Sequence, residues 1–422
     1  MSTERKPLGV ILLTIFVSMV GFGIVIPVLP IYARSAPFKL HPDQLGYLTG
    51  IFSLAQLIAA PFFGKLSDRF GRKPILLISI LGTTAGYLVT GAANAAWMLF
   101  AGRIIDGISG GNIAIAQTCI ADVTPPKERS KAMGLIGAAF GLGFILGPAI
   151  GGLLSAWWGP AAPFYFAAAL SLVNAGLVVV RLPETLSPEA RLHPAEKASL
   201  GEVFAGGRAQ FISVLLVSSL VFTTGFAFIH LLFALFCRDH FQWGVAESSY
   251  AFAYVGFVAV LVQGGLIRRL LKYPIEKELT VAGCFILALS LWLLPGAGSV
   301  AAFLGIAALL ALGNGLATPT FTGMASRHVH GRAQGRALGL MAGAGSLGRF
   351  LGPWLASKPL PPNFADLTPS PENLPILNQG YTTGFHTAAA LALAAGIITL
   401  FLRVPRENPE DAETAAAPVP AA

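Results

Sequence analysis

The segment GKLSDRFGRK, from Gly64 to Lys73, is the most informative part of the sequence for the fold. It places five charged side chains within ten residues, between the apolar runs Gln44–Phe63 and Pro74–Ala92. Glycine permits tight backbone turns, and charges are costly in hydrocarbon. Each apolar run has roughly the twenty residues that a helix needs to cross a bilayer. The segment therefore predicts a short polar turn between two transmembrane helices.

Apolar runs of similar length recur along the rest of the chain. Hydrophobic residues make up 55% of the 422 residues and charged residues only 11%, whereas a soluble domain carries about 25% charged residues. The runs lack the alternation of barrel strands, and helices satisfy their own backbone groups in lipid. We predict an all-α polytopic membrane protein with twelve transmembrane helices, at Leu8–Ile31, Gln44–Phe63, Pro74–Ala92, Ala96–Ile120, Ala132–Trp157, Ala161–Val180, Ala209–Phe236, Val245–Ile267, Leu279–Leu294, Ala301–Thr322, Ala337–Ala356 and Tyr381–Leu402.

The basic residues are distributed unevenly between the two sides of this arrangement. With both termini in the cytoplasm, the cytoplasmic segments hold 22 Lys and Arg residues, and the outer segments hold only Arg34, Lys39, Arg238 and Lys358. By the positive-inside rule, we expect a multi-pass protein of the cell membrane (the inner membrane in a bacterium) with both termini cytoplasmic. The same bias accounts for the net charge of +8 without a nucleic-acid partner.

The runs divide into two groups of six. We predict a first six-helix half at residues 1–180, a proline-containing cytoplasmic linker at 181–208, a second half at 209–402, and a disordered cytoplasmic tail at 403–422. The outer segment Lys358–Gly380 is rich in Pro and Asn. We interpret it as a solvated loop, with a lid as the alternative.

An internal repeat supports two related halves. Gly134-Leu135 and Gly147-Pro148 recur as Gly339-Leu340 and Gly352-Pro353 at one constant offset. Transporters are commonly built from such repeats, with the substrate site near the interface between them.

Three motifs carry a resemblance to a known family. The pattern G-x-L-x-D-R-x-G-R-K at Gly64 to Lys73 resembles the signature loop of the major facilitator superfamily. The stretch Gly21–Pro30 resembles the first helix of tetracycline-type exporters, although Ser18 stands where those exporters carry an acid, which argues against tetracycline itself. The fifth run resembles the antiporter motif of drug–proton exporters, whose residues here are Gly143, Gly147, Pro148, Gly151 and Gly152. Such glycines let helices approach closely.

The resemblance implies a fold and an activity. The fold is two pseudo-symmetric six-helix bundles that work by alternating access. The activity is proton-coupled antiport that exports amphipathic small molecules, as in drug or multidrug efflux. The implied partners are the substrate, protons and the lipid bilayer, for a protein that we expect to be a monomer without a cofactor or metal. The three cysteines form no CxxC pair that would indicate a metal site.

The resemblance also implies a conformational gate at the polar turn, formed by Gly64, Asp68, Arg69, Gly71 and Arg72. Asp68 is expected at the amino end of the eleventh helix, near Gln334–Arg336, where the helix dipole favours an anion. Arg72 is expected to pair with Asp122, at the cytoplasmic end of the fourth helix. These contacts would hold the outward-open state.

Ionisable residues inside the predicted spans are few and are functional hypotheses by default. Arg103 and Asp106 share a helical face, so they either couple protons or neutralise each other structurally. His230 suits a proton carrier, the alternative being a satisfied helix histidine. Arg349 is a candidate for binding a substrate anion or an internal acid, or is structural. All four are predicted at similar depth, so we expect them to converge.

Further candidates for substrate contact are polar or aromatic. Asn112, Gln117 and Asn314 lie on helices that line the cavity in the family, and they need partners in lipid. Phe222 and Phe226 either form an apolar wall of the cavity or face lipid and core.

Two rival functions remain at the level of sequence. One is a major facilitator transporter of a lipid or metabolite, and the other is a non-transporting membrane sensor or scaffold. An enzyme is not expected, because the sequence contains no nucleophile elbow, HExxH motif or phosphate loop.

Overall fold

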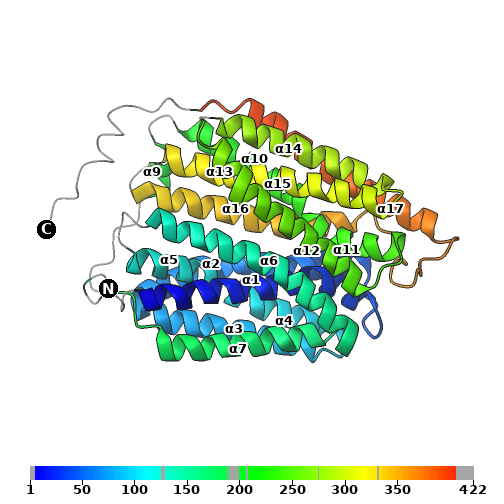
Figure 1. Cartoon of the computed structure of the whole chain (residues 1–422), viewed down its shortest axis with the longest axis horizontal. Coiled ribbons are helices and arrows are strands. Elements are labelled where there is room, and N and C mark those ends of the chain that lie inside the picture. Colours follow the sequence, from blue (N-terminus) through cyan, green and yellow to red (C-terminus); the bar gives the residue numbers. More distant parts are fainter. Residues whose placement is uncertain are drawn as a thin grey trace.

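The computed structural model describes residues 5–124, 129–187, 189, 199–205, 208–273, 275–329 and 332–404, and over these residues the regular elements are helical (Figure 1). The α-helices are α1 (Arg5–Arg34), α2 (Pro42–Phe70), α3 (Arg72–Gly91), α4 (Ala96–Ser109), α5 (Asn112–Val123), α6 (Arg129–Trp158), α7 (Ala162–Arg181), α9 (Leu200–Phe204), α10 (Ala209–Ala227), α11 (Ile229–His240), α12 (Val245–Leu261), α13 (Ile267–Leu270), α14 (Glu276–Leu293), α15 (Val300–His328), α16 (Arg332–Ser357) and α17 (Leu374–Leu400). The predicted all-α class is confirmed.

Eleven helices in the described part of the chain are long and apolar enough to cross a membrane, which makes this a multi-pass membrane protein. The predicted count of twelve is not confirmed. The eleventh predicted run, Ala337–Ala356, corresponds to α16, which has sufficient length but contains many glycines and Arg349. Because α16 packs between α2 and α10, several of its faces contact protein rather than lipid, and a less apolar composition suffices.

Three predicted runs contain irregular backbone that their hydropathy does not indicate. The fourth is divided at Gly110–Gly111 between α4 and α5, and the seventh at Phe228 between α10 and α11. The eighth contains a π-helical segment, Val262–Leu266, between α12 and α13. Irregular backbone at membrane depth is tolerated where it is enclosed by protein or lines a cavity. The twelfth run begins earlier than predicted, at Leu374.

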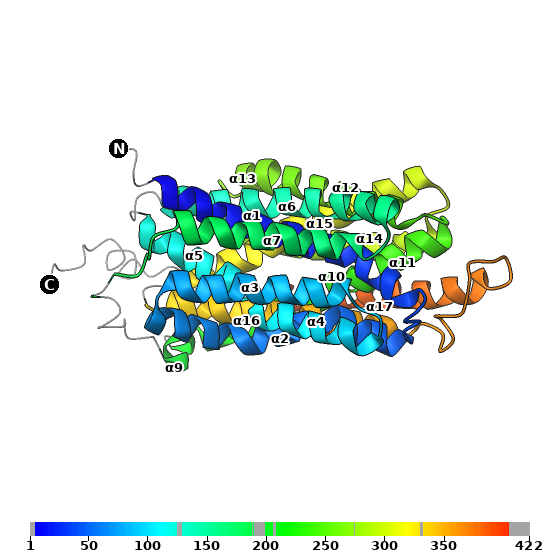
Figure 2. The same cartoon turned by 90° about the horizontal axis from the view of Figure 1, so that it is seen from below.

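The long helices lie side by side, and the bundle has two distinct ends (Figures 1 and 2). We call the end where α1 begins and α7 ends, near Arg181, the linker end. The end where α1 terminates at Arg34 is the far end. The short helix α9 falls within the predicted linker and lies at the linker end, whereas residues 188, 190–198 and 206–207 of that linker and residues 405–422 of the predicted tail lie outside the described part.

The helices α1–α7, which precede the linker, form the first half, and the helices α10–α17 form the second half. The two halves meet through two equivalent pairs, α2 with α16 and α6 with α12. Toward the far end, both pairs are tightly packed at glycines. A Cβ atom added to Gly50 of α2 would lie 2.7 Å from the carbonyl oxygen of Phe350, and one added to Gly256 of α12 would lie 2.8 Å from that of Phe144. Only glycine permits so close an approach of two backbones.

The same pairs are separated toward the linker end. A Cβ atom added to Gly64 of α2, or to Gly335 or Gly339 of α16, would meet no atom within 4 Å. The same holds for Gly137 of α6 and Gly264 in the π-helical segment. The helices therefore diverge from the far end to the linker end.

The outer segment Lys358–Gly380 differs from the solvated loop that we predicted. Phe364 is fully buried and Leu360 is nearly so. The segment also ends early, because α17 begins at Leu374. Leu360 and Phe364 are buried at the far end, whereas Asn363 and Asp366 are exposed. The lid alternative stays a prediction.

Candidate transport cavity and its two ends

A cavity of about 1870 Å³ lies between the two sets of helices. Its lining includes residues of α1, α2, α3, α4, α5 and α6 on one side and of α10, α11, α12, α13, α15 and α16 on the other. At the linker end its lining includes the exposed residues Lys65, Leu200 and Arg336, so the cavity reaches the molecular surface there. Its volume exceeds the roughly 300–1,000 Å³ of an ordinary small-molecule pocket.

The cavity gathers most of the residues singled out from the sequence. Its lining includes all seven substrate-binding candidates, Asn112, Gln117, Phe222, Phe226, His230, Asn314 and Arg349. It also includes Asp106, the acid of the intramembrane pair. Four gate residues line it as well, namely Gly64, Asp68, Arg72 and Asp122. Arg103 lines a small adjoining recess together with His230. Asp106, His230 and Arg349 therefore line the same cavity, and Arg103 lines the small recess beside it.

Arg103 and Asp106 form a buried ion pair in α4. The Arg103 Nη1 atom donates to the Asp106 Oδ2 atom at 2.8 Å, one helical turn away. The guanidinium also lies over the ring of Phe52, 4.6 Å from its centroid. Gly86 of α3 packs directly against Asp106, so a side chain there would displace the acid. The result is a carboxylate held at membrane depth beside the cavity with its counter-ion.

His230 and Arg349 have different surroundings. The His230 ring lies edge-on to Phe22 and Phe226, with centroid distances of 6.4 and 6.0 Å. The Arg349 Nη2 atom donates to the Ser346 hydroxyl at 2.8 Å. His230 is therefore surrounded by aromatic rings, whereas Arg349 places a positive charge on the cavity lining.

The polar candidates find partners of their own. Asn112 Nδ2 donates to the Ser18 hydroxyl at 3.0 Å, joining α5 to α1. Asn314 Oδ1 accepts from the Thr318 hydroxyl at 2.9 Å. Ser18, the position where tetracycline-type exporters carry an acid, therefore takes part in a neutral hydrogen bond on the cavity wall.

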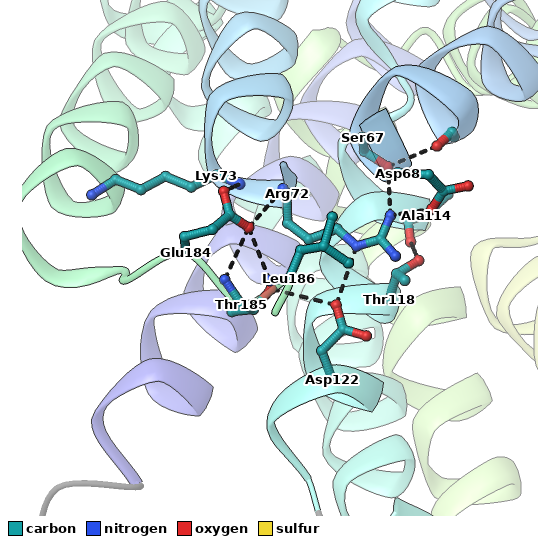
Figure 3. A network of polar contacts seen from close by, with 11 residues as sticks. Ser67, Asp68, Arg72, Lys73, Ala114, Thr118, Asp122, Glu184, Thr185 and Leu186 are labelled. Carbon is teal, nitrogen blue, oxygen red and sulfur yellow. Dashed lines mark hydrogen bonds and ion pairs between the residues drawn. The ribbon is translucent and has the colours of Figure 1, made fainter. Parts of the chain in front are cut away.

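Arg72 organises the polar network at the linker end (Figure 3). Its Nη1 atom donates to Asp68 Oδ1 at 2.5 Å and to the Ser67 hydroxyl at 2.9 Å, and its Nε atom donates to Asp122 Oδ2 at 3.1 Å. The predicted pairing of Arg72 with Asp122 is confirmed, but it forms here while the linker end is open, so the pair is not restricted to the outward-open state for which it was predicted. The predicted contact of Asp68 with the amino end of α16, near Gln334–Arg336, stays a prediction.

The turn between α2 and α3 depends on a glycine and on an acid that the sequence analysis did not select. Gly71 has φ of 105°, a conformation that side chains disfavour. The Glu184 carboxylate accepts from the backbone N–H groups of Arg72 and Lys73 at 2.8 and 3.3 Å (Figure 3). An anion at a helix amino end is favourable. Arg69, by contrast, is exposed and lies over the ring of Phe70, outside the cavity lining.

The motif in the fifth predicted run packs α6 against two neighbours. A Cβ atom added to Gly147 would lie 2.6 Å from the Val20 carbonyl oxygen of α1, and Pro148 contacts Gly23 of the same helix. Gly143 and Gly151 also face α1, whereas Gly152 packs against Ala246 and Ser249 of α12. The motif therefore holds α6 against α1 and joins it to the other half.

The far end contains a buried ion pair that the sequence analysis missed. Arg34 of α1 pairs with Asp239 of α11, and both side chains are almost completely buried. The Tyr381 hydroxyl donates to the same carboxylate at 2.6 Å. Arg34 Nε donates to the Phe364 carbonyl at 3.2 Å, and its guanidinium lies over that ring. The only sequence signal was the position of Arg34 and Asp239 at the ends of apolar runs.

The ion pairs whose side chains are described follow a simple pattern. At the far end they join the two halves, as Arg34–Asp239, Lys39–Asp366 and Asp43–Lys358. At the linker end they lie within one half, as Asp68–Arg72, Arg72–Asp122 and Glu276–Arg327. Together with the glycine contacts, this pattern describes a cavity closed at the far end and open toward the linker end.

Two sets of helices with a large cavity between them form the architecture of a membrane transporter. A family model described as Major Facilitator Superfamily matches residues 11–353, and the chain belongs to that family. It is 34% identical over 363 residues to the class C tetracycline resistance protein of Escherichia coli, covering 84% of this chain and 89% of that protein. It is 33% identical over 368 residues to multidrug resistance protein 2 of Bacillus subtilis (strain 168), covering 83% and 88%.

Solved structures support the same fold. One is a bacterial homolog of the human lysosomal transporter Spinster in an inward-facing and occupied conformation. It superposes with a TM-score of 0.78 at 16% identity and covers 95% of this chain and 97% of that one. The resemblance to the major facilitator fold that the motifs indicated is therefore confirmed.

Proposed function

We propose that the protein is a proton-coupled antiporter that exports amphipathic small molecules from the cytoplasm. The observation that carries this proposal is the large, mostly aromatic and aliphatic cavity with a buried Arg103–Asp106 pair on its wall. The similarity to tetracycline and multidrug resistance proteins supports export of drug-like compounds. The neutral Ser18–Asn112 contact replaces an acid expected for tetracycline and favours a different substrate.

The proposed orientation places the linker end in the cytoplasm, as the basic-residue distribution favours. In this orientation the structure is the state that receives substrate from the inside. The Arg34–Asp239 pair and the segment around Phe364 close the outer side. Export requires the far end to open and the linker end to close.

Asp106 is the proposed proton-binding group. A carboxylate at membrane depth is costly unless it is paired or protonated. Protonation would release Asp106 from Arg103, and the freed guanidinium would then face the recess that it shares with His230. Antiport of substrate and proton in opposite directions results if the two cannot occupy the cavity at the same time.

Vesicle flux tests this function. Purified protein in proteoliposomes should release protons when an amphipathic substrate is added, in a panel of drugs, lipids and metabolites. Asp106→Asn should abolish uphill transport but retain substrate binding, because the amide cannot carry the proton. A mutant that concentrates substrate at the wild-type rate would make Asp106 structural. Flux of lipids or metabolites alone would favour the rival substrate class, and binding without flux would favour a sensor.

A further inference from the structure

Arg349 differs from Arg72 and Arg103 in its electrostatic environment. Among the described residues, no carboxylate lies within ion-pair distance of it, and its hydrogen bond goes to the neutral hydroxyl of Ser346. The acids that line the cavity, Asp68, Asp106 and Asp122, are each paired with Arg72 or Arg103 of the first half. The second half therefore presents an uncompensated guanidinium to the cavity.

The position of Arg349 within the cavity is apolar. Gly348, the preceding residue, packs against Thr223 of α10, which places Arg349 level with the aromatic residues Phe222 and Phe226. Both rings line the same cavity, as does His230. Arg349 is partly buried and lines the cavity, so a ligand that fills the cavity would displace water from its charge, which is unfavourable without an opposite charge. A site of this composition favours a ligand that brings its own negative group.

We propose that Arg349 anchors a carboxylate of the transported molecule, so that the cavity selects organic acids or zwitterions with an aromatic or aliphatic body. This inference rests on the proposed export function and specifies its substrate class. A guanidinium matches the planar carboxylate with two parallel hydrogen bonds. The apolar body would lie against Phe226 and the edge of the His230 ring. The paired Asp106 would remain available for the proton.

A matched pair of fluorescent ligands tests the anchor. Dansyl-phenylalanine carries a carboxylate, and its methyl ester has nearly the same shape without the charge. The full chain, purified in nanodiscs, should bind the acid about tenfold or more tightly than the ester, as a charge-assisted contact predicts. Arg349→Gln should remove this preference by weakening binding of the acid alone. Arg349→Lys should retain part of it. Arg268→Gln, at an exposed position outside the cavity, should leave both affinities unchanged.

The outcomes separate this inference from the proposed function. Equal binding of acid and ester by the wild type, or a preference that survives in Arg349→Gln, overturns the anchor. Loss of ester binding in Arg349→Gln makes the residue structural and also overturns it. Binding of neither ligand counts against both the anchor and an amphipathic cavity. Preferential binding of the acid without flux of any panel compound in proteoliposomes overturns the transport proposal and leaves the anchor standing.

Discussion

The two ends of the α2–α16 and α6–α12 pairs both contain several glycines, but the helices are in contact at one end and separated at the other. Both ends are rich in glycine. At the far end, Gly50 and Gly256 bring the backbones into contact, whereas Gly64 and Gly339 at the linker end face open space. Glycine content therefore does not determine which end is closed. It makes either end capable of closing.

The polar contacts differ more clearly between the ends. At the far end a buried pair, Arg34–Asp239, joins the halves. At the linker end Arg72 binds Asp68 and Asp122 within one half. Because a bond within a half moves with that half, the contacts of Arg72 with Asp68 and Asp122 do not themselves fix the distance between the halves. The closed end is the one whose described ion pairs cross the interface.

The largest expected effect comes from breaking the buried far-end pair. Asp239→Asn leaves Arg34 buried without its counter-ion, which costs about 3–5 kcal/mol, so the far end should open. Cys237 lies two residues away and is fully buried and free. In a variant whose other two cysteines are alanine, labelling of Cys237 by a membrane-impermeant maleimide should rise about tenfold or more.

The exposed far-end pair provides the matched control. Asp366→Asn removes a bridge to Lys39 in which both side chains are largely exposed, and such pairs are worth about 0–1 kcal/mol. Labelling of Cys237 should then stay near the wild-type rate. If Asp239→Asn labels no faster than Asp366→Asn, the buried pair does not hold the far end closed.

A second comparison uses one glycine at each end of the same helix pair. Gly50→Val should reduce thermal stability by about 1–3 kcal/mol, because the added atoms meet the Phe350 carbonyl. Gly339→Val should leave stability near the wild-type value, since its surroundings are open. It should still slow vesicle flux by about fivefold, corresponding to about 1 kcal/mol, because the linker end must close during transport. Thermal melts and flux assays measure the two effects, and full flux in Gly339→Val would argue against closure there.

Much of the fold could be predicted because bilayer thickness fixes helix length and composition. The Arg103–Asp106 pair followed from i,i+3 spacing on one helix, and the Arg72–Asp122 pair from a motif. Hydropathy could not show the break between α10 and α11 at Phe228. An apolar residue such as Phe228 has the same hydropathy whether it continues a helix or interrupts one.

The far-end pair could not be predicted for a different reason. Arg34 and Asp239 belong to different halves, and no local periodicity relates two residues so far apart. The sequence placed Arg34 among the few outer basic residues, which is consistent with an exposed surface charge. Its burial depends on Phe364 and on the way the two halves meet, which is a property of the assembled bundle.

The smallest expected effect concerns Asp68, at the open end. Arg72 keeps Asp122 as a partner when Asp68 is replaced, and Asp68 is partly exposed, so Asp68→Asn should change stability by no more than about 1 kcal/mol. Expression should remain close to wild type. If Asp68 engages the amino end of α16 when the linker end closes, vesicle flux should still fall about threefold, corresponding to less than about 1 kcal/mol. Arg181→Gln is the control at the same end, because Arg181 is exposed and outside the cavity lining. Equal flux in the two variants would mean that the charge of Asp68 has no specific part in closure, whereas a selective loss would assign to Asp68 the contact between halves that the linker end needs.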